Sequence, residues 1–183
     1  SNFYEESVSI PCIIKGPGIP VEKTVKTPVS LIDVCPTILK TAGITLKAKP
    51  GTSLVDLANA VDDTERLVFS EYHAVGSVTG AFMVRKGQWK LIYYVSMQPQ
   101  LFNLAEDPEE LRDLGADPEH EGIRRQLEAE LRSICDPEAV DAMAKADQMA
   151  IINANGGIEA VVAKGGFAAT PPPGVNAEFV SQK

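Results

Sequence analysis

Histidine is scarce in this 183-residue sequence, and basic residues are outnumbered. His73 and His120 are its two histidines, so an HExxH zinc site is excluded, and neither a Ser/His/Asp order nor a phosphate-cradling glycine loop is present. The 17 basic residues are mixed among 25 acidic ones, which argues against a nucleic-acid partner. No stretch approaches the roughly 18 uninterrupted apolar residues of a membrane span. The sequence therefore predicts no nucleic-acid partner and no membrane partner.

Cysteine is also rare, and its pattern argues against a metal site and against a disulfide framework. Cys12, Cys35 and Cys135 are odd in number, far apart, and without the spacing of metal ligands. Three unpaired thiols fit a reducing compartment better than a secreted protein. The cysteines therefore predict a cytoplasmic location.

A small antiparallel sheet is predicted in the middle of the chain. Apolar and aromatic runs cover residues 67–72, 81–85, 89–95 and 100–104. Gly87 supplies the positive φ that a tight hairpin needs between the second and third runs. A sheet with one apolar face requires a cover, and the amphipathic segment 122–134 predicts the helix that provides it.

The segments on either side of this sheet predict further elements. Val8–Ile14 is typical of a strand buried on both faces of an α/β sheet. Residues 29–43 predict a helix, with Ser30 or Asp33 as its cap and Gly43 at its end, and residues 54–61 predict one or two helical turns. A second helix is expected from Asp136 to about Asn153. The Gly-, Ala- and Pro-rich chain from Asn155 onward has too little hydrophobic surface to fold alone.

Few residues are candidates for chemistry. His73 follows a predicted strand, so its imidazole could face a cleft as an acid/base group or anion donor, or could be a surface histidine without a role. His120 is expected to be solvated in an acidic loop. Arg85–Gly87 could bind an anion, although positive charges at a hairpin turn usually serve solubility. Glu5–Glu6 are expected to be caps or surface residues, and the spacing of Asp107–Glu110 does not match a calcium loop.

Several segments, in this order, resemble the C-terminal part of the sulfatase family in the alkaline-phosphatase-like superfamily. They are Tyr4–Pro11, Lys15–Gly18, Val29–Leu39 with Ala42–Ile44, Gly51–Leu54, Phe69–Tyr72, Val84–Ile92 and Leu101–Glu110. The resemblance implies an α/β fold. Residues 1–65 would form the end of a parallel-sheet core, residues 66–135 a four-stranded antiparallel sheet packed by a helix, and residues 136–183 a C-terminal extension.

The resemblance also implies a chemistry whose central groups are missing from this sequence. Family members cleave sulfate esters with a formylglycine, made from the Cys or Ser of a Cys/Ser-x-Pro-x-Arg motif, and with a divalent cation, usually calcium. That motif does not occur here: Cys35–Pro36 has the wrong register, and Cys135–Ala139 ends in Ala where Arg is required. The family's metal-binding segment lies upstream of the block that begins at Ser1. No catalytic or metal-binding residue is therefore expected, and the chain alone is expected to be inactive.

The resemblance leaves His73 as the one predicted substrate-binding residue. It implies a small-molecule or carbohydrate sulfate ester as substrate, a bacterial type of enzyme, and a homo-oligomer formed through the C-terminal extension. Two alternatives stay open. One is a phosphodiesterase or phosphonate monoester hydrolase of the same superfamily, and the other is a non-catalytic binding or assembly module.

Overall fold

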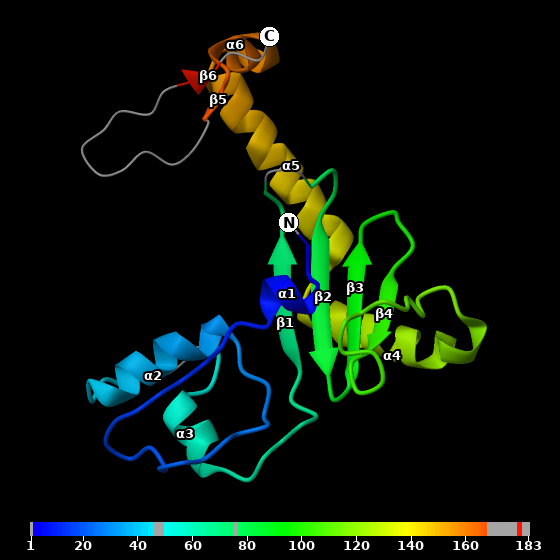
Figure 1. The fold of residues 1–183 in the computed structure, drawn as a ribbon. Coiled ribbons are helices and arrows are strands. Elements are labelled where there is room, and N and C mark those ends of the chain that lie inside the picture. The colour runs from blue at the N-terminus through cyan, green and yellow to red at the C-terminus, as the bar shows by residue number, and fades with distance from the viewer. Residues whose placement is uncertain (1, 46–49, 75–76, 168–178, 181–183) are drawn as a thin grey trace. The chain divides into compact units, whose positions relative to one another are not determined.

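The chain forms two compact units, Ser1–Pro137 and Glu138–Lys183. The computed structural model describes residues 2–45, 50–74, 77–167 and 179–180 (Figure 1). The helices are α1 (Glu5–Val8), the 3-10 helix η1 (Leu31–Asp33), α2 (Val34–Thr41), α3 (Leu54–Asn59), the 3-10 helix η2 (Pro118–His120), α4 (Glu121–Ile134), α5 (Pro137–Ala154) and α6 (Gly157–Lys164). The strands are β1 (Val68–Tyr72), β2 (Ala81–Lys86), β3 (Trp89–Tyr94), β4 (Gln100–Asn103), β5 (Gly166–Phe167) and β6 (Phe179–Val180).

The first unit is built on the sheet that the sequence predicts. Its strands lie in the order β1-β2-β3-β4, and each neighbouring pair is antiparallel. Lys86 pairs with Trp89 across a two-residue turn, in which Gly87 has a φ of 58°. That angle is left-handed and favours glycine, which is why the hairpin turns here. The prediction of a four-stranded antiparallel sheet is confirmed.

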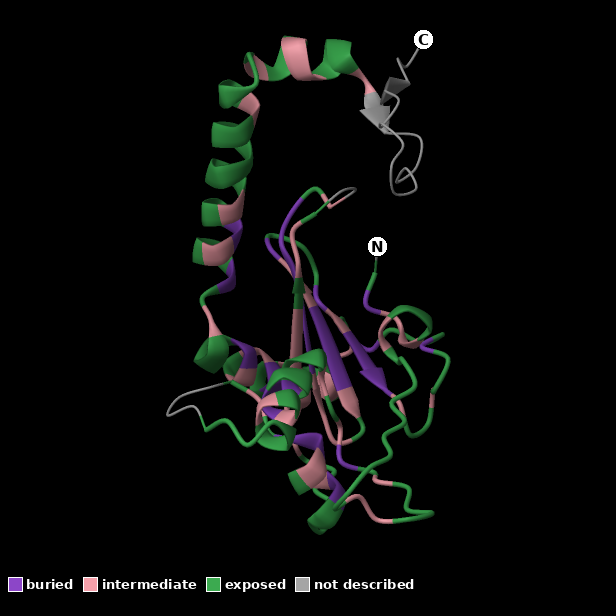
Figure 2. Ribbon diagram, turned by 90° about the vertical axis from the view of Figure 1, so that its left-hand side faces the viewer, coloured by how far each residue is buried: buried purple, intermediate pink, exposed green. Residues whose placement is uncertain are grey.

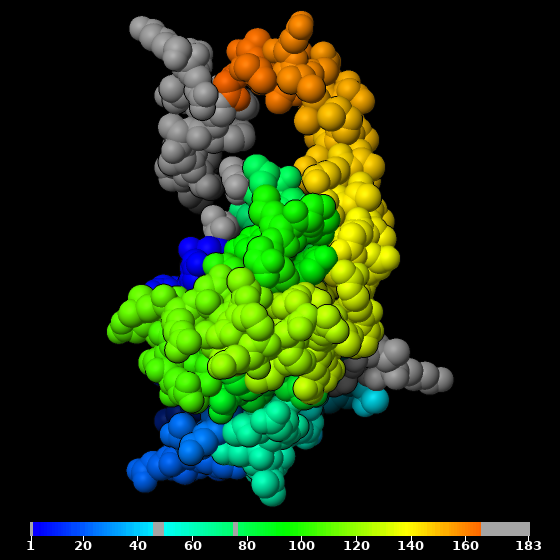
Figure 3. Space-filling view, turned by 90° about the vertical axis from the view of Figure 1, so that its right-hand side faces the viewer, coloured from blue at the N-terminus to red at the C-terminus, as the bar shows by residue number. Residues whose placement is uncertain are grey.

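One face of the sheet is covered by α4, as predicted (Figure 2). Side chains alternate between faces along a strand, so one set of apolar residues points toward this helix. They are the fully buried Phe82, Val84, Leu91 and Leu101, and the helix adds the buried Leu127 and Leu131. Figure 3 shows α4 and the preceding loop side by side on the molecular surface. This layer is an apolar core formed by local hairpins and one helix.

The other face of the sheet is covered by the beginning of the chain. Phe3 packs in a cluster with Ala81, Met83, Ile92 and Phe102. The ring of Tyr4 meets that of Phe102 edge-on, with ring centroids 5.7 Å apart, and α1 follows directly in front of the sheet (Figure 1). The sheet is therefore buried on both sides, by segments from opposite ends of the unit.

The strand predicted for Val8–Ile14 is wrong. Glu5–Val8 is helical, and the following residues form neither a helix nor a strand. Ile10 is 61% exposed and Ile13 is 93% exposed. A buried strand needs neighbouring strands for its hydrogen bonds. The described strands pair among themselves, in the orders β1-β2-β3-β4 and β5-β6, so in the described part of the chain no strand pairs with residues 9–14.

The helix predicted for residues 29–43 is present as η1 followed by α2, and Gly43 ends it at a φ of 71°. Asp33 holds this segment to the chain that follows it. Its carboxylate is fully buried and accepts hydrogen bonds from Arg66 at 2.8 and 3.0 Å and from the backbone N–H groups of Thr52 and Ser30 at 2.8 and 2.9 Å. All of these donors stabilise the ionised form.

Burial by itself raises the pKa of the Asp33 carboxyl, but the hydrogen bonds from Arg66, Thr52 and Ser30 outweigh it. The net effect is a pKa below the ordinary value. A carboxyl with a lowered pKa in the folded state contributes stability above its unfolded pKa, about 3.9, and that contribution is lost as the pH falls through the folded value.

The second unit contains α5, which confirms the predicted second helix. It also contains α6, which the Gly-rich composition of this segment did not predict. Glu159, Ala160 and Ala163 are good helix formers, and this short run supports the helix between glycines. Gly156, at a φ of 96°, separates α5 from α6.

Some predictions for the C-terminal part of the chain stay untested. The Pro-rich stretch at 170–174 lies outside the described residues. The three-part domain division and the oligomeric role of the extension stay predictions. Among the helices of the described ranges, none combines the length and apolar character that crossing a membrane requires.

Replacing Asp33 with Asn is expected to lower the free energy of unfolding by about 3 kcal/mol, because Arg66 loses a buried ionised partner. Asp56→Asn is the matched control: Asp56 pairs with Lys40 at an exposed site, so its loss should cost less than about 1 kcal/mol. Urea unfolding at pH 7 and pH 3 measures both. The difference in unfolding free energy between the two variants should be smaller at pH 3 than at pH 7. A difference that does not change with pH would contradict the role of the Asp33 charge.

Candidate functional site

A cluster of four charged side chains lies on the sheet face that the beginning of the chain covers. Lys90 of β3 is fully buried, and its Nζ lies 2.9 Å from Oε1 of Glu5 and 2.8 Å from Oε1 of Glu110. Arg85 of β2 lies 3.5 Å from Oε2 of Glu5. The backbone N–H of Glu5 also donates to Oε2 of Glu110 at 2.5 Å. Two carboxylates and two cations thus balance one another.

This charge cluster is built to hold the fold together. Glu5, Lys90 and Glu110 come from three segments far apart in sequence, and a buried ammonium is stable only with such partners. The expectation that Glu5 is a cap or surface residue needs correction, because its carboxylate binds two cations. The two cations of the possible anion site at Arg85–Gly87 are also paired, because Arg85 contacts Glu5 and Lys86 contacts Glu130.

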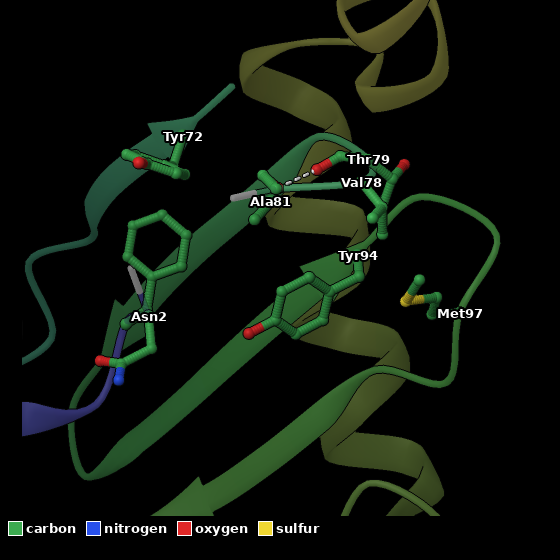
Figure 4. Close-up of a pocket in the computed structure, with 9 residues that line it drawn as sticks. Asn2, Tyr72, Val78, Thr79, Ala81, Tyr94 and Met97 are labelled. Carbon is green, nitrogen blue, oxygen red and sulfur yellow. Dashed lines mark hydrogen bonds between the residues drawn. The ribbon is translucent and has the colours of Figure 1, made fainter. Parts of the chain in front are cut away.

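A pocket of about 170 Å³ opens at one end of the same sheet face (Figure 4). It collects side chains from the start of the chain, the end of β1, the loop before β2, the open end of the β2–β3 pair, and the loop after β3. The lining residues are Asn2, Phe3, Tyr72, Ser77, Val78, Thr79, Ala81, Tyr94 and Met97. None of the nine carries a charge. The pocket is therefore neutral, and three of its nine lining side chains are aromatic.

Tyr94 stays neutral in this setting. Burial raises the pKa of its phenol, and the nearby hydroxyl of Tyr4 raises it further. Both effects disfavour the phenolate. At pH 7 the pocket therefore offers uncharged rings together with hydroxyl and amide groups.

His73 lies on the other side of the sheet from this pocket. Its ring meets that of Phe82 edge-on, with centroids 5.3 Å apart, and its Nε2 lies 3.8 Å from Oε2 of Glu71. Phe82 and the pocket residue Ala81 are consecutive in β2, so their side chains point to opposite faces. The ring of His73 therefore packs on the face opposite the side chain of Ala81, and its substrate-binding role stays a prediction.

His120 differs from the solvated residue that its acidic neighbours predict. Its side chain is 25% exposed, its Nδ1 lies 3.2 Å from Oδ2 of Asp117, and its ring lies 5.7 Å from that of Trp89. The backbone N–H of Glu119 and the His120 side chain lower the pKa of the Asp117 carboxyl. His120 is thus part of the cap that begins the helical segment before α4.

The described residues do not fit a metal ion. Across residues 2–45, 50–74, 77–167 and 179–180, no three His, Cys, Asp or Glu side chains lie close enough together to hold one. The calcium implied by the sulfatase resemblance has no ligand set in that part of the chain, so no step of a reaction is assigned to it.

Comparison with known proteins identifies the family. Residues 2–136 match the family described as N-sulphoglucosamine sulphohydrolase, C-terminal. The chain belongs to the sulfatase family. The match covers the four-stranded sheet, its cover on both faces and all of the pocket-lining residues.

Two curated sulfatases and one solved structure illustrate the similarity. Arylsulfatase K of Mus musculus is 38% identical over 154 residues, which cover 77% of this chain and 27% of the mouse protein. Choline-sulfatase of Rhizobium meliloti is also 38% identical over 154 residues, covering 80% of this chain and 30% of that protein. The structure of a 2-O GAG sulfatase has a TM-score of 0.54 and 28% identity, covering 73% of this chain and 29% of that one.

The chain therefore spans less than a third of the length of these relatives. The relatives come from animals and from bacteria, so the bacterial type predicted from the sequence stays a prediction. The site that matters to a sulfatase, the nucleophile motif, is absent from this sequence. The pocket was missed by sequence reasoning because it joins segments whose pairing no local pattern reveals.

Replacing Lys90 with Met is expected to lower the free energy of unfolding by about 3–5 kcal/mol, because Glu110 would remain buried without its cation. Adding Glu110→Gln should recover part of this loss, since the orphaned charge is then removed. Lys40→Met, at an exposed ion pair, is the control and should cost less than about 1 kcal/mol. Equal losses for Lys90→Met and Lys40→Met in chemical unfolding would show that the charge cluster does not stabilise the fold.

Proposed function

We propose that this chain is the C-terminal part of a sulfuric ester hydrolase that cleaves a small-molecule or carbohydrate sulfate ester. The observation that carries the proposal is the match of residues 2–136 to a sulfatase C-terminal family, together with a structure that has the sheet and covering helix implied by it. In this proposal the formylglycine nucleophile and the divalent cation belong to the remainder of the enzyme.

The surface of residues 10–38 supports the assignment of the catalytic groups to the remainder of the enzyme. Large apolar side chains are exposed along it, including Ile13 at 93%, Leu31 at 72% and Ile38 at 60%. Apolar side chains gathered on one segment mark a contact with another body. We infer that the catalytic part of the enzyme packs against this segment.

The charges of the chain support the same division. A sulfate ester is an anion, and its developing charge must be stabilised by cations or a metal. Arg85 and Lys90, on the sheet face that carries the pocket, are already paired with Glu5 and Glu110. This chain would then shape the site for the rest of the substrate, while the remainder of the enzyme binds the sulfate group.

The proposal is tested by the hydrolysis of 4-nitrophenyl sulfate. A longer protein that contains this chain and a Cys/Ser-x-Pro-x-Arg motif should release nitrophenol, and it should lose that activity when the Cys or Ser of the motif is replaced by Ala. The 183-residue chain alone should show no turnover. Turnover by the chain alone, or a longer protein that cleaves phosphonate monoesters in preference to sulfate esters, would refute the proposal.

His73 keeps its proposed role as a substrate-binding residue of the whole enzyme. His73→Ala should lower kcat/KM by about 10- to 100-fold, as expected for a lost hydrogen bond to a charged group. His120→Ala is the matched control, because His120 pairs with Asp117. The same loss in both variants would assign the effect to folding rather than to substrate contact. The cytoplasmic location predicted from the cysteines stays a prediction, and the free Cys12 and Cys35 are the observation in its favour.

A further inference from the structure

The two edges of the four-stranded sheet differ in what covers them. β4 forms one edge, and the chain closes it: the backbone N–H of Leu114 donates to the carbonyl of Leu101 at 2.8 Å, and the N–H of Leu101 donates to Oδ1 of Asp113 at 3.0 Å. β1 forms the other edge (Figure 1). Its residues are partly buried or exposed, unlike the buried Ala81–Val84 of β2. Among the described residues, no strand pairs with the outer side of β1.

The strand register shows which backbone groups of β1 face outward. The carbonyl of Gly80 accepts from the N–H of Val95 at 3.1 Å, so the backbone of Gly80 faces β3. Backbone groups alternate in direction along a strand, so the next residue faces β1, where it pairs with Tyr72. The same alternation along β1 turns the N–H and C=O groups of Phe69 and Glu71 outward. Within the described ranges, these outward groups make no hydrogen bond.

The sequence of β1 gives this edge little protection. Soluble proteins usually guard a free edge with proline, a bulge, several charges or a covering segment, because open backbone groups bind other strands. β1 pairs with β2 at five consecutive positions without a bulge. The sequence from Val68 to Tyr72 contains no proline and one charged residue, Glu71. Such an edge is expected to be covered in the native protein.

The position of the edge indicates which body covers it. Arg66, two residues before β1, donates to the carbonyl of Pro28 at 2.6 Å and to Oδ2 of Asp33 at 3.0 Å. These bonds join the start of β1 to residues 10–38, whose exposed apolar side chains we infer to face the catalytic part of the enzyme. The chain spans less than a third of the length of its relatives, so most of the enzyme is available to supply a strand.

We propose that the outer edge of β1 binds an extended segment of the catalytic part of the enzyme, which extends the sheet by one strand. This assignment rests on the proposed function, which gives the catalytic groups to the remainder of the enzyme. The added strand exchanges N–H···O hydrogen bonds with Phe69 and Glu71, the mode by which extended segments join an exposed sheet edge. Its residue beside Glu71 is basic or uncharged, because like charges on neighbouring strands destabilise a sheet.

Residue-resolved hydrogen exchange tests this pairing in two proteins. One is the 183-residue chain, and the other is a longer protein that contains this chain and a Cys/Ser-x-Pro-x-Arg motif. In the chain alone, the amides of Phe69 and Glu71 should exchange about tenfold or more faster than that of Ser70, which faces β2. In the longer protein, exchange at Phe69 and Glu71 should slow by about 100-fold or more.

Two results of this measurement would overturn strand addition by the catalytic part. One is exchange at Phe69 and Glu71 that is equally fast in both proteins. The other is protection that appears in the chain alone and grows with its concentration, because a second copy of the chain would then be the occupant.

Matched variants separate backbone pairing from simple burial. Glu71→Pro removes an outward N–H, and edge strands tolerate proline at such positions. Glu71→Ala is the control, because it removes the same carboxylate and keeps the N–H. Circular dichroism of the chain alone should show both variants folded. In the longer protein, Glu71→Pro should abolish the slow exchange of the Phe69 amide, and Glu71→Ala should retain it.

The outcome of the variants is decisive in either direction. Slow exchange of the Phe69 amide in both variants of the longer protein would contradict backbone pairing. If Glu71→Pro unfolds the chain alone, the comparison of the two unsubstituted proteins decides. Hydrolysis plays no part in hydrogen exchange. An active longer protein with a freely exchanging β1 edge therefore leaves the proposed function standing, and an inactive one with a protected edge leaves strand addition standing.

Discussion

The four-stranded sheet has two faces to bury, and the chain covers them in different ways. The α4 face is closed by a helix that follows the sheet in sequence, with Leu127 and Leu131 against an apolar layer. The opposite face is closed by Phe3 and α1, which precede β1 by about sixty residues of chain. Closing this second face is the costlier step, because a long loop loses entropy when its ends are joined. The ion pairs of Glu5 with Lys90 and Arg85 help to hold that closure in place.

The second face divides into a charged part and a neutral part. Toward the hairpin turn, Arg85 and Lys90 are bound by carboxylates. Toward the other end, Tyr72, Ala81 and Tyr94 line an uncharged pocket. The cations of this face are thus paired within the chain, and its uncharged side chains lie at the opposite end of the strands.

Local patterns predicted most of the fold. The apolar runs and Gly87 predicted the sheet and its hairpin, and the spacing of Leu127 and Leu131 predicted the covering helix. The strand at Val8–Ile14 failed because an apolar run does not reveal whether partner strands are at hand. The partial burial of Glu5 and His120 was also missed, because such a residue is covered by partners that its local sequence does not reveal.

The candidate site was harder to predict than the fold, and its residues explain why. The two-residue turn at Gly87 fixes Ala81 opposite Tyr94, so half of the pocket follows from the hairpin. The pairing of Tyr72 with Ala81 depends on the longer loop between β1 and β2, whose length allows several registers. The contribution of Phe3 depends on a contact across most of the unit. No property of any one segment contains that information.

The alternation of side chains along β3 has a consequence for folding specificity. Lys90 lies between Trp89 and Leu91, which point toward the α4 face. A slip of β3 by one residue would turn Lys90 into the apolar layer and Leu91 out of it. An ammonium placed there would lose its two carboxylate partners, Glu5 and Glu110, and such a state is strongly disfavoured. The buried lysine thus favours the observed alignment of β3 over the alignment shifted by one residue.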